Sequence, residues 1–400
     1  MAIQEAAGDG IRSERRQAAF LYDPRFRGAA YQVLLVVLVV WIAYVAVSNA
    51  YENLRQAQIA SGFGFLTETA GFSIAQKLIP YSEVSSYGRA FLIGLLNTLL
   101  VAVIGIVFAT VFGFIIGVAR LSSNFVIRSL ATVYVELTRN IPLLLQLFFW
   151  YFAVLASLPS PRNSIDLPFG FFLSTRGLAM PKAVLSPGWQ IVLVLFLVSL
   201  VCAFVLARWA RARQMRTGQQ FPSFLAGFGL IVGTTFLALL VTGFPISFQV
   251  PELTGFNFSG GVGVIPEFVA LLVALSIYTA GFIAEIVRAG ILAVSHGQTE
   301  ASYSLGLRAN PTLRLVIVPQ ALRVIIPPLT SQYLNLTKNS SLAVAIGYPD
   351  FFQVFAGTVL NQTGQAIEVI AMTMGVYLTI SLLTSAFMNW YNRRVALVER

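Results

Sequence analysis

Residues 91–118 read FLIGLLNTLLVAVIGIVFATVFGFIIGV, a run of 28 residues without a charged side chain. A helix of about 20 apolar residues is long enough to cross the hydrocarbon core of a bilayer. This run therefore predicts a membrane-spanning helix. Seven further apolar runs predict spans of the same kind, at residues 30–48, 143–158, 189–207, 224–241, 268–286, 315–334 and 367–388.

The composition of the 400-residue chain places it in the same class. Hydrophobic residues make up 57% of the chain and charged residues only 10%, whereas a soluble domain carries about 25% charged residues. The single cysteine, Cys202, has no partner for an internal disulfide. Together with the single histidine, His296, it is also too little for a four-ligand zinc site, so we expect no metal centre.

The net charge of +10 is spread in short basic clusters beside the apolar runs rather than gathered on one soluble face. This pattern is typical of membrane orientation, in which Lys and Arg favour the cytoplasmic side, and we expect no nucleic-acid partner. With eight crossings, most of the 26 Lys and Arg residues fall on one side together with both termini. Without the span at residues 315–334, which contains Arg323 and three prolines, Arg393 and Arg394 would lie on the opposite side. The charges therefore predict eight spans with both termini in the cytoplasm.

The segments between the spans differ in character. Residues 49–86, 159–188 and 243–267 are rich in Gly, Pro, Ser and Asn, which predicts turns and irregular structure rather than a folded domain. Residues 122–140 instead carry apolar side chains at helical spacing, which predicts either an amphipathic helix at the membrane surface or a simple extension of the next span. Within the span at 91–118, Gly113 and Gly117 form a GxxxG pair that permits close approach of another helix.

The loop that follows Arg288 contains a short predicted helix at residues 298–305. Glu300 lies in its first turn, where a carboxylate favours a helix N-terminus, and Gly306 follows its end, where glycine commonly adopts a positive φ. Ala301 and Ser302 keep one face of this helix narrow. Such an exposed helix suits a groove of a partner protein, but it could equally pack on its own subunit.

The spacing of residues around this helix carries a resemblance. Glu300, Ala301 and Ser302 are followed after three residues by Gly306, and after nine more by VIVP at residues 316–319. This resembles the EAA loop of ABC importer permeases: E-A-A, three residues, G, nine residues, I-x-L-P. Ser at the third position and Val for Ile and Leu are mild departures. Other segments are similar to the polar-amino-acid permease family, namely YTAGFIAEIVRAG (278–290), HGQ (296–298), PQALRVIIPPL (319–329), LTKNSSLAVAIGYPDF (336–351), GLLNTLLVAV (94–103) and YVELTRNIPLLLQLFFWYF (134–152).

The resemblance covers residues 86–158 and 265–394 and implies a five-helix type I ABC importer permease core. One N-terminal span and two inserted spans complete the eight, so the expected fold class is an all-α integral membrane protein. The expected divisions are a tail, first span and outer loop, then the first part of the core, the insertion and the second part of the core, at residues 1–85, 86–158, 159–264 and 265–400. With this layout the chain looks most like one of the two membrane subunits of general L-amino-acid importers.

The same resemblance implies a function and partners. The function is import of polar L-amino acids across the bacterial inner membrane, with ATP-Mg held by separate ATPase subunits. A second permease subunit, in a heterodimer, and an extracytoplasmic amino-acid-binding protein complete the assembly. The chain itself has no GxxxxGK[ST] phosphate loop, so we expect it to hold no cofactor and not to be an enzyme. The residues implied to couple it to the ATPase are His296, Gly297, Gln298, Glu300, Ala301, Ser302 and Gly306.

An amino acid needs placed partners for its ammonium and carboxylate groups inside a membrane. The candidate pathway residues are Asn97, Thr98, Arg139, Gln146, Glu285, Arg288, Gln320, Asn335, Lys338, Ser340 and Ser341. Each has an alternative interpretation. Glu285 and Arg288 are spaced for a helix-surface ion pair. For Lys338, which is grouped with Ser340 and Ser341, the alternative is snorkelling to the interface. For Asn97, Thr98, Arg139, Gln146, Gln320 and Asn335 the alternative is a hydrogen bond between helices.

The rival function is an ion-coupled secondary transporter. Proton or sodium coupling usually uses carboxylates deep in the membrane. Glu285 and Glu368, the nearest candidates, lie close to the ends of predicted spans. The sequence therefore favours the ATP-driven importer.

Overall fold

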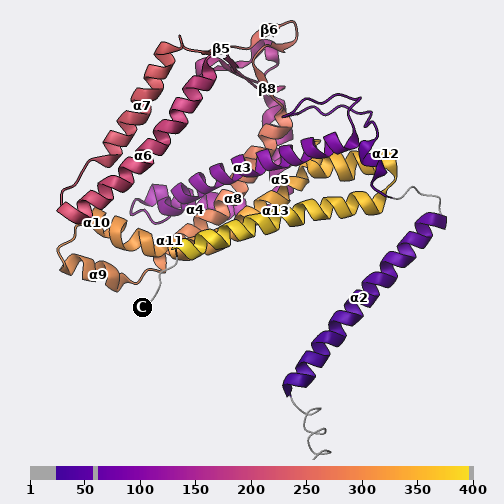
Figure 1. Cartoon of the computed structure of the whole chain (residues 1–400), viewed down its shortest axis with the longest axis horizontal. Coiled ribbons are helices and arrows are strands. Elements are labelled where there is room, and N and C mark those ends of the chain that lie inside the picture. The colour runs from indigo at the N-terminus through magenta and orange to yellow at the C-terminus, as the bar shows by residue number, and fades with distance from the viewer. Residues whose placement is uncertain (1–23, 57–61, 396–400) are drawn as a thin grey trace, which may run out of the picture.

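The computed structural model describes residues 24–56 and 62–395, and helices dominate them (Figure 1). Within these residues seven helices are long and apolar enough to cross a membrane, and a bent pair of helices makes an eighth candidate. The predicted helical membrane protein is confirmed. The long helices are α2 (Pro24–Gln56), α3 (Tyr87–Ala119), α6 (Trp189–Thr217), α7 (Ser223–Val241), α8 (Pro266–Leu292), α11 (Val318–Asn339) and α13 (Ala366–Val395).

The bent pair corresponds to the predicted span at residues 143–158 and the amphipathic stretch before it. Its first arm is α4 (Phe125–Asn140), and its second arm is formed by α5 (Leu143–Phe148), η2 (Phe149–Val154) and η3 (Leu155–Ser157). The arms meet at 108°, so α4 is a separate helix and the alternative of a simple extension is wrong. Pro142 cannot donate a backbone hydrogen bond, which interrupts the helix at this corner. Gln146 fixes the corner, because its Nε2 donates to the carbonyls of Thr138 and Ile141, each at 2.9 Å.

The core of the molecule is built by α3, α8 and α11. The GxxxG pair predicted in the sequence lies at the contact between α3 and α8: a Cβ on Gly113 would come within 2.5 Å of Ile283, and one on Gly117 within 2.7 Å of the Ala284 carbonyl. Gly290 plays the same part between α8 and α11, where a Cβ would lie 2.3 Å from the Ile325 side chain. Small residues thus bring the three backbones close together, as interfaces between membrane helices require.

A second apolar cluster lies at the start of α3 and α13. It joins the segment before α3, with its short helix η1 (Gly64–Thr67), to the turns that follow α11. Phe351 and Phe355 stack on each other at 5.1 Å and are both fully buried in this cluster. The turns between α11 and α13 are η7 (Ser340–Ile346), η8 (Gln353–Val359) and α12 (Leu360–Thr363).

The prediction of irregular structure for residues 159–188 and 243–267 is wrong, because these segments form strands. Three antiparallel sheets have the orders β1-β2-β3-β8, β4-β5 and β6-β7. Two pairings, β3 with β8 and β4 with β5, join segments more than 60 residues apart in the chain. Such long-range pairing leaves no mark in a local pattern. The strands are β1 (Ile165–Leu167), β2 (Phe171–Ser174), β3 (Gly177–Met180), β4 (Lys182–Leu185), β5 (Ile246–Gln249), β6 (Glu252–Thr254), β7 (Asn257–Ser259) and β8 (Val262–Val264).

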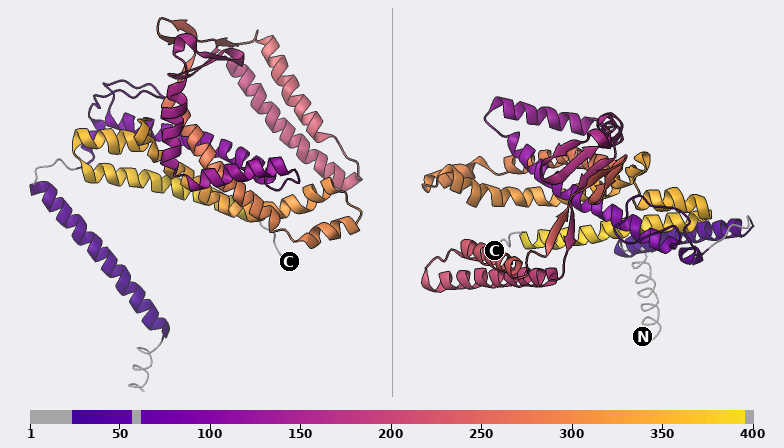
Figure 2. Two further views of the ribbon diagram at one scale, coloured as in Figure 1. Left: turned by 180° about the vertical axis from the view of Figure 1, so that it is seen from behind. Right: turned by 90° about the horizontal axis from the view of Figure 1, so that it is seen from above.

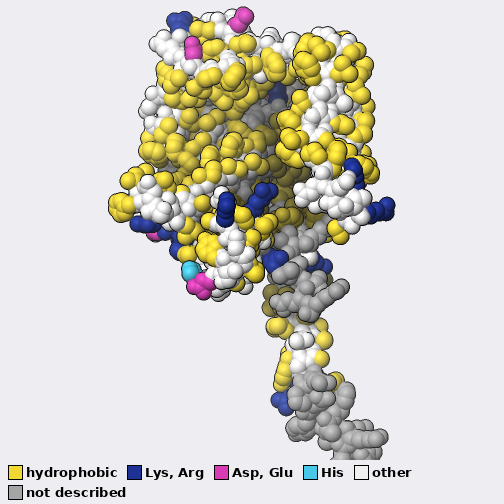
Figure 3. All heavy atoms as spheres, turned by 90° about the vertical axis from the view of Figure 1, so that its left-hand side faces the viewer, with side chains coloured by type: hydrophobic (Ala, Val, Ile, Leu, Met, Phe, Trp, Pro, Cys, Tyr) yellow, Lys and Arg dark blue, Asp and Glu magenta, His cyan; other side chains and the backbone are white. Residues whose placement is uncertain are grey.

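The α6–α7 pair connects β4 to β5 and stands beside the core (Figure 2). Its two helices pack on each other, and α2 lies apart from the bundle in Figure 1 and in the left-hand view of Figure 2. The short helices α9 (His296–Ser304), α10 (Ala309–Thr312) and η6 (Leu313–Ile317) join α8 to α11 at the end opposite the strands. Two further short helices, η4 (Pro161–Asn163) and η5 (Pro168–Gly170), flank β1. Figure 3 shows hydrophobic side chains over most of one face, with charged side chains gathered near its two ends. This distribution suits a bundle that crosses a membrane.

Candidate functional site

The predicted loop helix is present as α9, which ends at Ser304. Gly306 adopts a φ of +79°, a left-handed conformation that glycine takes without steric cost. The backbone N–H of Gly306 donates to the Tyr303 carbonyl at 2.9 Å, and that of Leu307 donates to the Ser302 carbonyl at 3.1 Å. These bonds satisfy the last turn of the helix, so the predicted glycine stop is confirmed.

Most of α9 is exposed. Of the seven residues predicted to contact the ATPase, only Ser302 is buried, and its hydroxyl donates to the Gln298 carbonyl at 2.6 Å. His296 and Glu300 pair on the outer surface, with Nδ1 and Oε1 3.0 Å apart. The apolar Tyr303 and Leu305 are 52% and 82% exposed. The helix therefore presents charged and apolar side chains to its surroundings.

The loop helix is tied to the bundle through α11. Gln320, on the first turn of α11, donates from Nε2 to Oε1 of Gln298 at 3.3 Å. From there α11 packs along α8, with Ile325 against Gly290. Gln298 of α9 is thus linked through α11 to the two helices at the centre of the molecule.

A charged cluster lies at the end of α8 that leads to α9. The carboxylate of Glu285 is hydrogen-bonded to Arg288, with Nη2 2.6 Å from Oε1, so the predicted ion pair on α8 is confirmed. Arg120, at the end of α3, forms a second ion pair with Glu285. Arg139 of α4 approaches to 4.0 Å and also lies over the ring of Phe282 at 5.5 Å. One carboxylate therefore joins α3, α4 and α8.

Sequence reasoning missed Arg120 as a member of this cluster. Arg120 is separated from Glu285 by 165 positions, and its side chain is only 11% exposed. Its place among the basic residues at the ends of spans was visible in the sequence, but the partner was not.

Three other predicted pathway residues are fully or almost fully buried within the chain. Asn97 donates from Nδ2 to the carbonyls of Gln76 and Pro349, at 2.9 and 2.8 Å. The Thr98 hydroxyl accepts from the backbone N–H of Phe351 at 2.9 Å, and Ser340 donates to the Thr337 carbonyl at 2.8 Å. The bonds of Asn97 to Pro349 and of Thr98 to Phe351 anchor α3 to the turns after α11, whereas the Ser340 bond is local to the end of α11. A contact between these side chains and a substrate stays a prediction.

A buried carboxylate that the sequence analysis did not single out lies beside these residues. Asp350 is 0% exposed and accepts hydrogen bonds from the backbone N–H of Gln353 at 2.8 Å and from the hydroxyl of Tyr377 at 3.1 Å. The signal available in the sequence was an acidic residue inside the apolar run IGYPDF. Because its bonds join η8 to α13, Asp350 stabilises the same junction as Asn97 and Thr98.

The predicted residues on the second half of α11 are more open. Asn335 and Lys338 are exposed and, three positions apart, share one helix face, while Ser331 lies a turn earlier on that face. Ser341 is half-buried and donates to the Lys338 carbonyl at 2.8 Å. Polar side chains on the surface of a spanning helix are costly against lipid and are usually turned toward protein or water. The structure thus separates the candidates into a buried group at α3 and the start of η7, a corner residue at Gln146, the Glu285 cluster, Gln320 beside α9, and an exposed face of α11.

No candidate metal site is found in the part of the chain that the structure describes. Across residues 24–56 and 62–395, His, Cys, Asp and Glu side chains nowhere gather in a group of three able to hold a metal ion. The expectation that separate ATPase subunits hold ATP-Mg concerns other chains and stays a prediction.

Comparison with known proteins gives a family match. Residues 109–397, more than two thirds of the chain, match the family described as binding-protein-dependent transport system inner membrane component. The chain is 54% identical over 380 residues to the general L-amino acid transport system permease protein AapQ of Rhizobium johnstonii. The matched region covers 95% of each chain.

Two further relatives match along nearly the whole length. The putative amino-acid ABC transporter permease protein YhdX of Escherichia coli is 54% identical over 378 residues, covering 94% of this chain and 96% of that protein. The glutamate/glutamine/aspartate/asparagine transport system permease protein BztB of Rhodobacter capsulatus is 41% identical, covering 98% and 99%. With a spanning-helix bundle, an EAA-type loop helix and this match, the chain belongs to the binding-protein-dependent transport system inner membrane components and is a permease subunit of an ABC importer.

Proposed function

We propose that this permease imports polar L-amino acids across the bacterial inner membrane. The support is the naming of its relatives as amino-acid permeases, at 54% identity over 94–95% of the chain. ATP-Mg is bound and hydrolysed on separate ATPase subunits, a second, non-identical permease closes the path, and an extracytoplasmic binding protein delivers the amino acid. The family membership leaves the ion-coupled secondary transporter without support.

The observation that carries the coupling part of the proposal is α9. Glu300 and Tyr303 of this helix, and Leu305 directly after it, are exposed. The Ser302 hydroxyl bonds the Gln298 carbonyl within the helix, and the Gln298 side chain bonds Gln320 of α11. A short helix with an exposed mixed face suits a groove on the ATPase. Closure of the ATPase pair then moves α9 as a rigid element, and α11 and α8 switch between two packings. In this arrangement both termini are cytoplasmic, on the same side as α9.

The exposed face of α11 supports the path for the amino acid. Lys338 supplies a cation and Asn335 a hydrogen-bonding amide on a surface that the second permease would cover. A substrate carboxylate is attracted to Lys338. At the other end, the cluster of Arg139, Glu285 and Arg288 lies where the path opens toward α9 and serves as a gate whose ion pairs must rearrange.

The test uses the whole transporter, with ATPase subunits, second permease and binding protein, in proteoliposomes. Gly306→Trp places a side chain at φ +79° on the surface of the loop, where L residues are strained. We expect ATP-dependent uptake of L-glutamine to fall at least tenfold while the amount of protein in the membrane is unchanged. Glu300→Arg reverses a charge on the exposed face of α9 and is expected to act in the same direction.

The matched control is Gly218→Trp. Gly218 also follows a helix, α6, has a φ of +71° and, like Gly306, has no atom within 4 Å of an added Cβ. It lies outside α9, so we expect uptake close to that of the wild type. If Gly306→Trp kept wild-type ATP-dependent uptake, α9 would not be the coupling element.

A further inference from the structure

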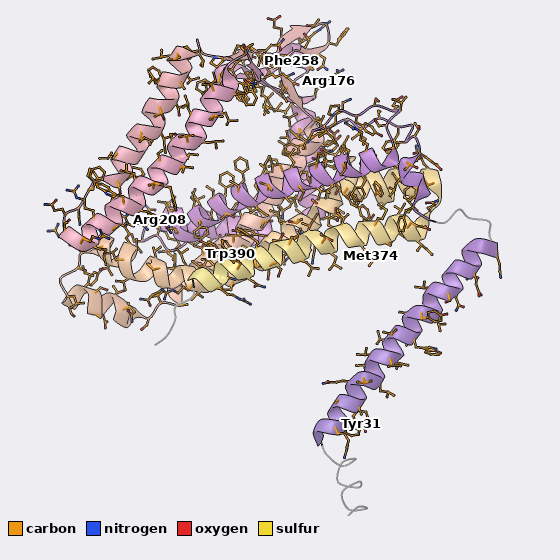
Figure 4. All side chains as sticks on the ribbon, viewed as in Figure 1. Tyr31, Arg176, Arg208, Phe258, Met374 and Trp390 are labelled. Carbon is orange, nitrogen blue, oxygen red and sulfur yellow. The ribbon has the colours of Figure 1, made fainter. Side chains whose placement is uncertain are left out.

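A cavity of about 500 Å³ lies between the four-stranded sheet and the start of α8. Its walls include Tyr151, Ser174, Arg176, Asn257, Phe258 and Glu267. Figure 4 shows Arg176 and Phe258 in the strand region, far from the helix ends where Arg208 lies. The volume falls in the range of small-molecule sites, about 300–1,000 Å³. Because α8 begins here and ends just before α9, the cavity opens at the end of the bundle opposite the ATPase-coupling helix.

Two charged residues are brought to this cavity by the packing of one glycine. Gly177 begins β3 with a φ of +96°, and a Cβ there would lie 2.1 Å from the Val264 carbonyl and 2.9 Å from the Pro266 nitrogen. No other residue allows the β2–β3 turn to approach the start of α8 so closely. Leu178 pairs with Val264. Arg176 lies in the turn just before Gly177, and Glu267 lies in the first turn of α8, so both residues line the cavity.

The two charges share the cavity without neutralising each other. Oε1 of Glu267 accepts a hydrogen bond from the Tyr151 hydroxyl at 2.8 Å, which orients the carboxylate and leaves its second oxygen available. Among the described residues, ion pairs form between other side chains, so the Arg176 guanidinium and the Glu267 carboxylate are farther apart than direct contact. The exposed Arg176 and the half-buried Glu267 therefore line one cavity without pairing with each other.

We propose that this cavity binds a free α-amino acid as its zwitterion. Arg176 donates to the carboxylate, in the paired geometry that a guanidinium offers, and Glu267 accepts from the ammonium group. Phe258, stacked on Phe172 at 4.8 Å, supplies an apolar wall for the side chain of the ligand. This inference rests on the proposed substrate class. It adds to the path along α11 a separate site, built largely by the strands of residues 159–264, which holds an amino acid before it enters.

The test measures binding to the assembled transporter in nanodiscs, without nucleotide and without binding protein, by equilibrium dialysis. Three probes separate the two charges: L-glutamine, 4-aminobutanamide, which lacks the carboxylate, and glutaramate, which lacks the ammonium group. We expect Arg176→Met to weaken L-glutamine binding at least tenfold and to leave 4-aminobutanamide binding unchanged. Glu267→Gln is expected to weaken L-glutamine binding at least tenfold and to leave glutaramate binding unchanged.

Two features of the experiment distinguish the loss of one charge from a general loss of structure. The amide introduced by Glu267→Gln keeps an oxygen for the Tyr151 hydroxyl, so the local hydrogen bond survives. The control Lys182→Met removes an exposed cation on β4 that does not line the cavity, and it is expected to bind all three probes as the wild type does. Unfolding would weaken the binding of all three probes equally. A loss that differs with the group that the probe lacks therefore reports the charge itself.

Three outcomes overturn the proposal: no binding of L-glutamine by the wild type, wild-type binding in both variants, or an equal loss for all three probes. A separate assay measures the affinity of the same variants for the binding protein. Reduced affinity there with unchanged L-glutamine binding is a fourth outcome that overturns the proposal, because the cavity would then hold a protein side chain. ATP-driven uptake by the wild-type transporter is measured separately. If the wild-type transporter takes up amino acids but the binding test overturns the cavity site, the proposed function stands without this site.

Discussion

The core helices α3, α8 and α11 and the inserted pair α6–α7 are all apolar enough to cross a membrane, yet they bury different shares of their surface. Within its apolar window α8 is 56% buried, whereas α6 and α7 are each 11% buried. The core has glycines where backbones meet, such as Gly117 against Ala284 and Val287, while Gly229 and Gly233 of α7 have nothing within 4 Å. Hydropathy indicates that a helix spans a membrane, and the position of small residues indicates what it packs against.

The largest expected effect comes from filling a close contact in the core. In Gly117→Leu the new Cβ lies 2.7 Å from the Ala284 carbonyl, and because that atom belongs to the backbone of α8 it cannot move aside cheaply. Overpacking of this kind costs up to about 3 kcal/mol. We expect a clear fall in the temperature at which the detergent-purified protein loses its monodisperse elution on size exclusion.

The matched substitution is Gly229→Leu in α7. No atom lies within 4 Å of its Cβ, and leucine is a better helix former than glycine by roughly 1 kcal/mol. The inserted pair should therefore keep or slightly raise its stability. Equal losses of thermal stability in the two variants would show that α7 is as tightly packed as α3, so the core and the inserted pair would not differ in packing.

The second prediction concerns charge. In Glu285→Gln the carboxylate that joins Arg120, Arg139 and Arg288 becomes neutral, and three cations remain together at the ends of α3, α4 and α8. Hydrogen bonds to charged groups contribute about 2 kcal/mol. We expect a loss of that order in the same elution assay, partly recovered at high salt, which screens the repulsion.

The control in the inserted pair is Arg211→Gln, on the exposed last part of α6. Among the described residues no carboxylate forms an ion pair with Arg211, so the thermal stability should change little. Stability that is unaffected by Glu285→Gln would mean that the cluster is solvated and does not hold the three helices together.

The sequence predicted what local chemistry decides. Apolar runs marked the spans, and Glu300 and Gly306 marked a short helix and its end, because these signals depend on neighbours within one turn. It also predicted the Glu285–Arg288 pair, since positions three apart share a helix face.

What the sequence could not reveal are contacts between distant segments. Strands β3 and β4 pair with β8 and β5 across the whole α6–α7 insertion, and Arg120 of α3 pairs with Glu285 of α8. Asp350 lies in an apolar run, but the run does not reveal that its carboxylate bonds Tyr377 of α13. In each case the partner is fixed by tertiary packing, which no local pattern encodes.

The smallest expected effect separates a hydroxyl that bonds another segment from one that bonds its own helix. The Thr98 hydroxyl accepts from the buried N–H of Phe351 at 2.9 Å, and Thr98→Val leaves this N–H without a partner. The Thr235 hydroxyl of α7 donates to the Ile231 carbonyl at 2.7 Å, one turn earlier in the same helix, and that carbonyl keeps its helical bond when the hydroxyl is removed.

We therefore expect Thr98→Val to destabilise the protein by about 1 kcal/mol and Thr235→Val to have almost no effect. Hydrogen exchange of the Phe351 amide, followed by mass spectrometry of peptides that contain it, reports the same bond directly. Exchange there should quicken in Thr98→Val and stay unchanged in Thr235→Val. If uptake also fell in Thr98→Val by far more than the loss of folded protein explains, Thr98 would act on the substrate as well as on packing, and the buried junction at α3 would be part of the path.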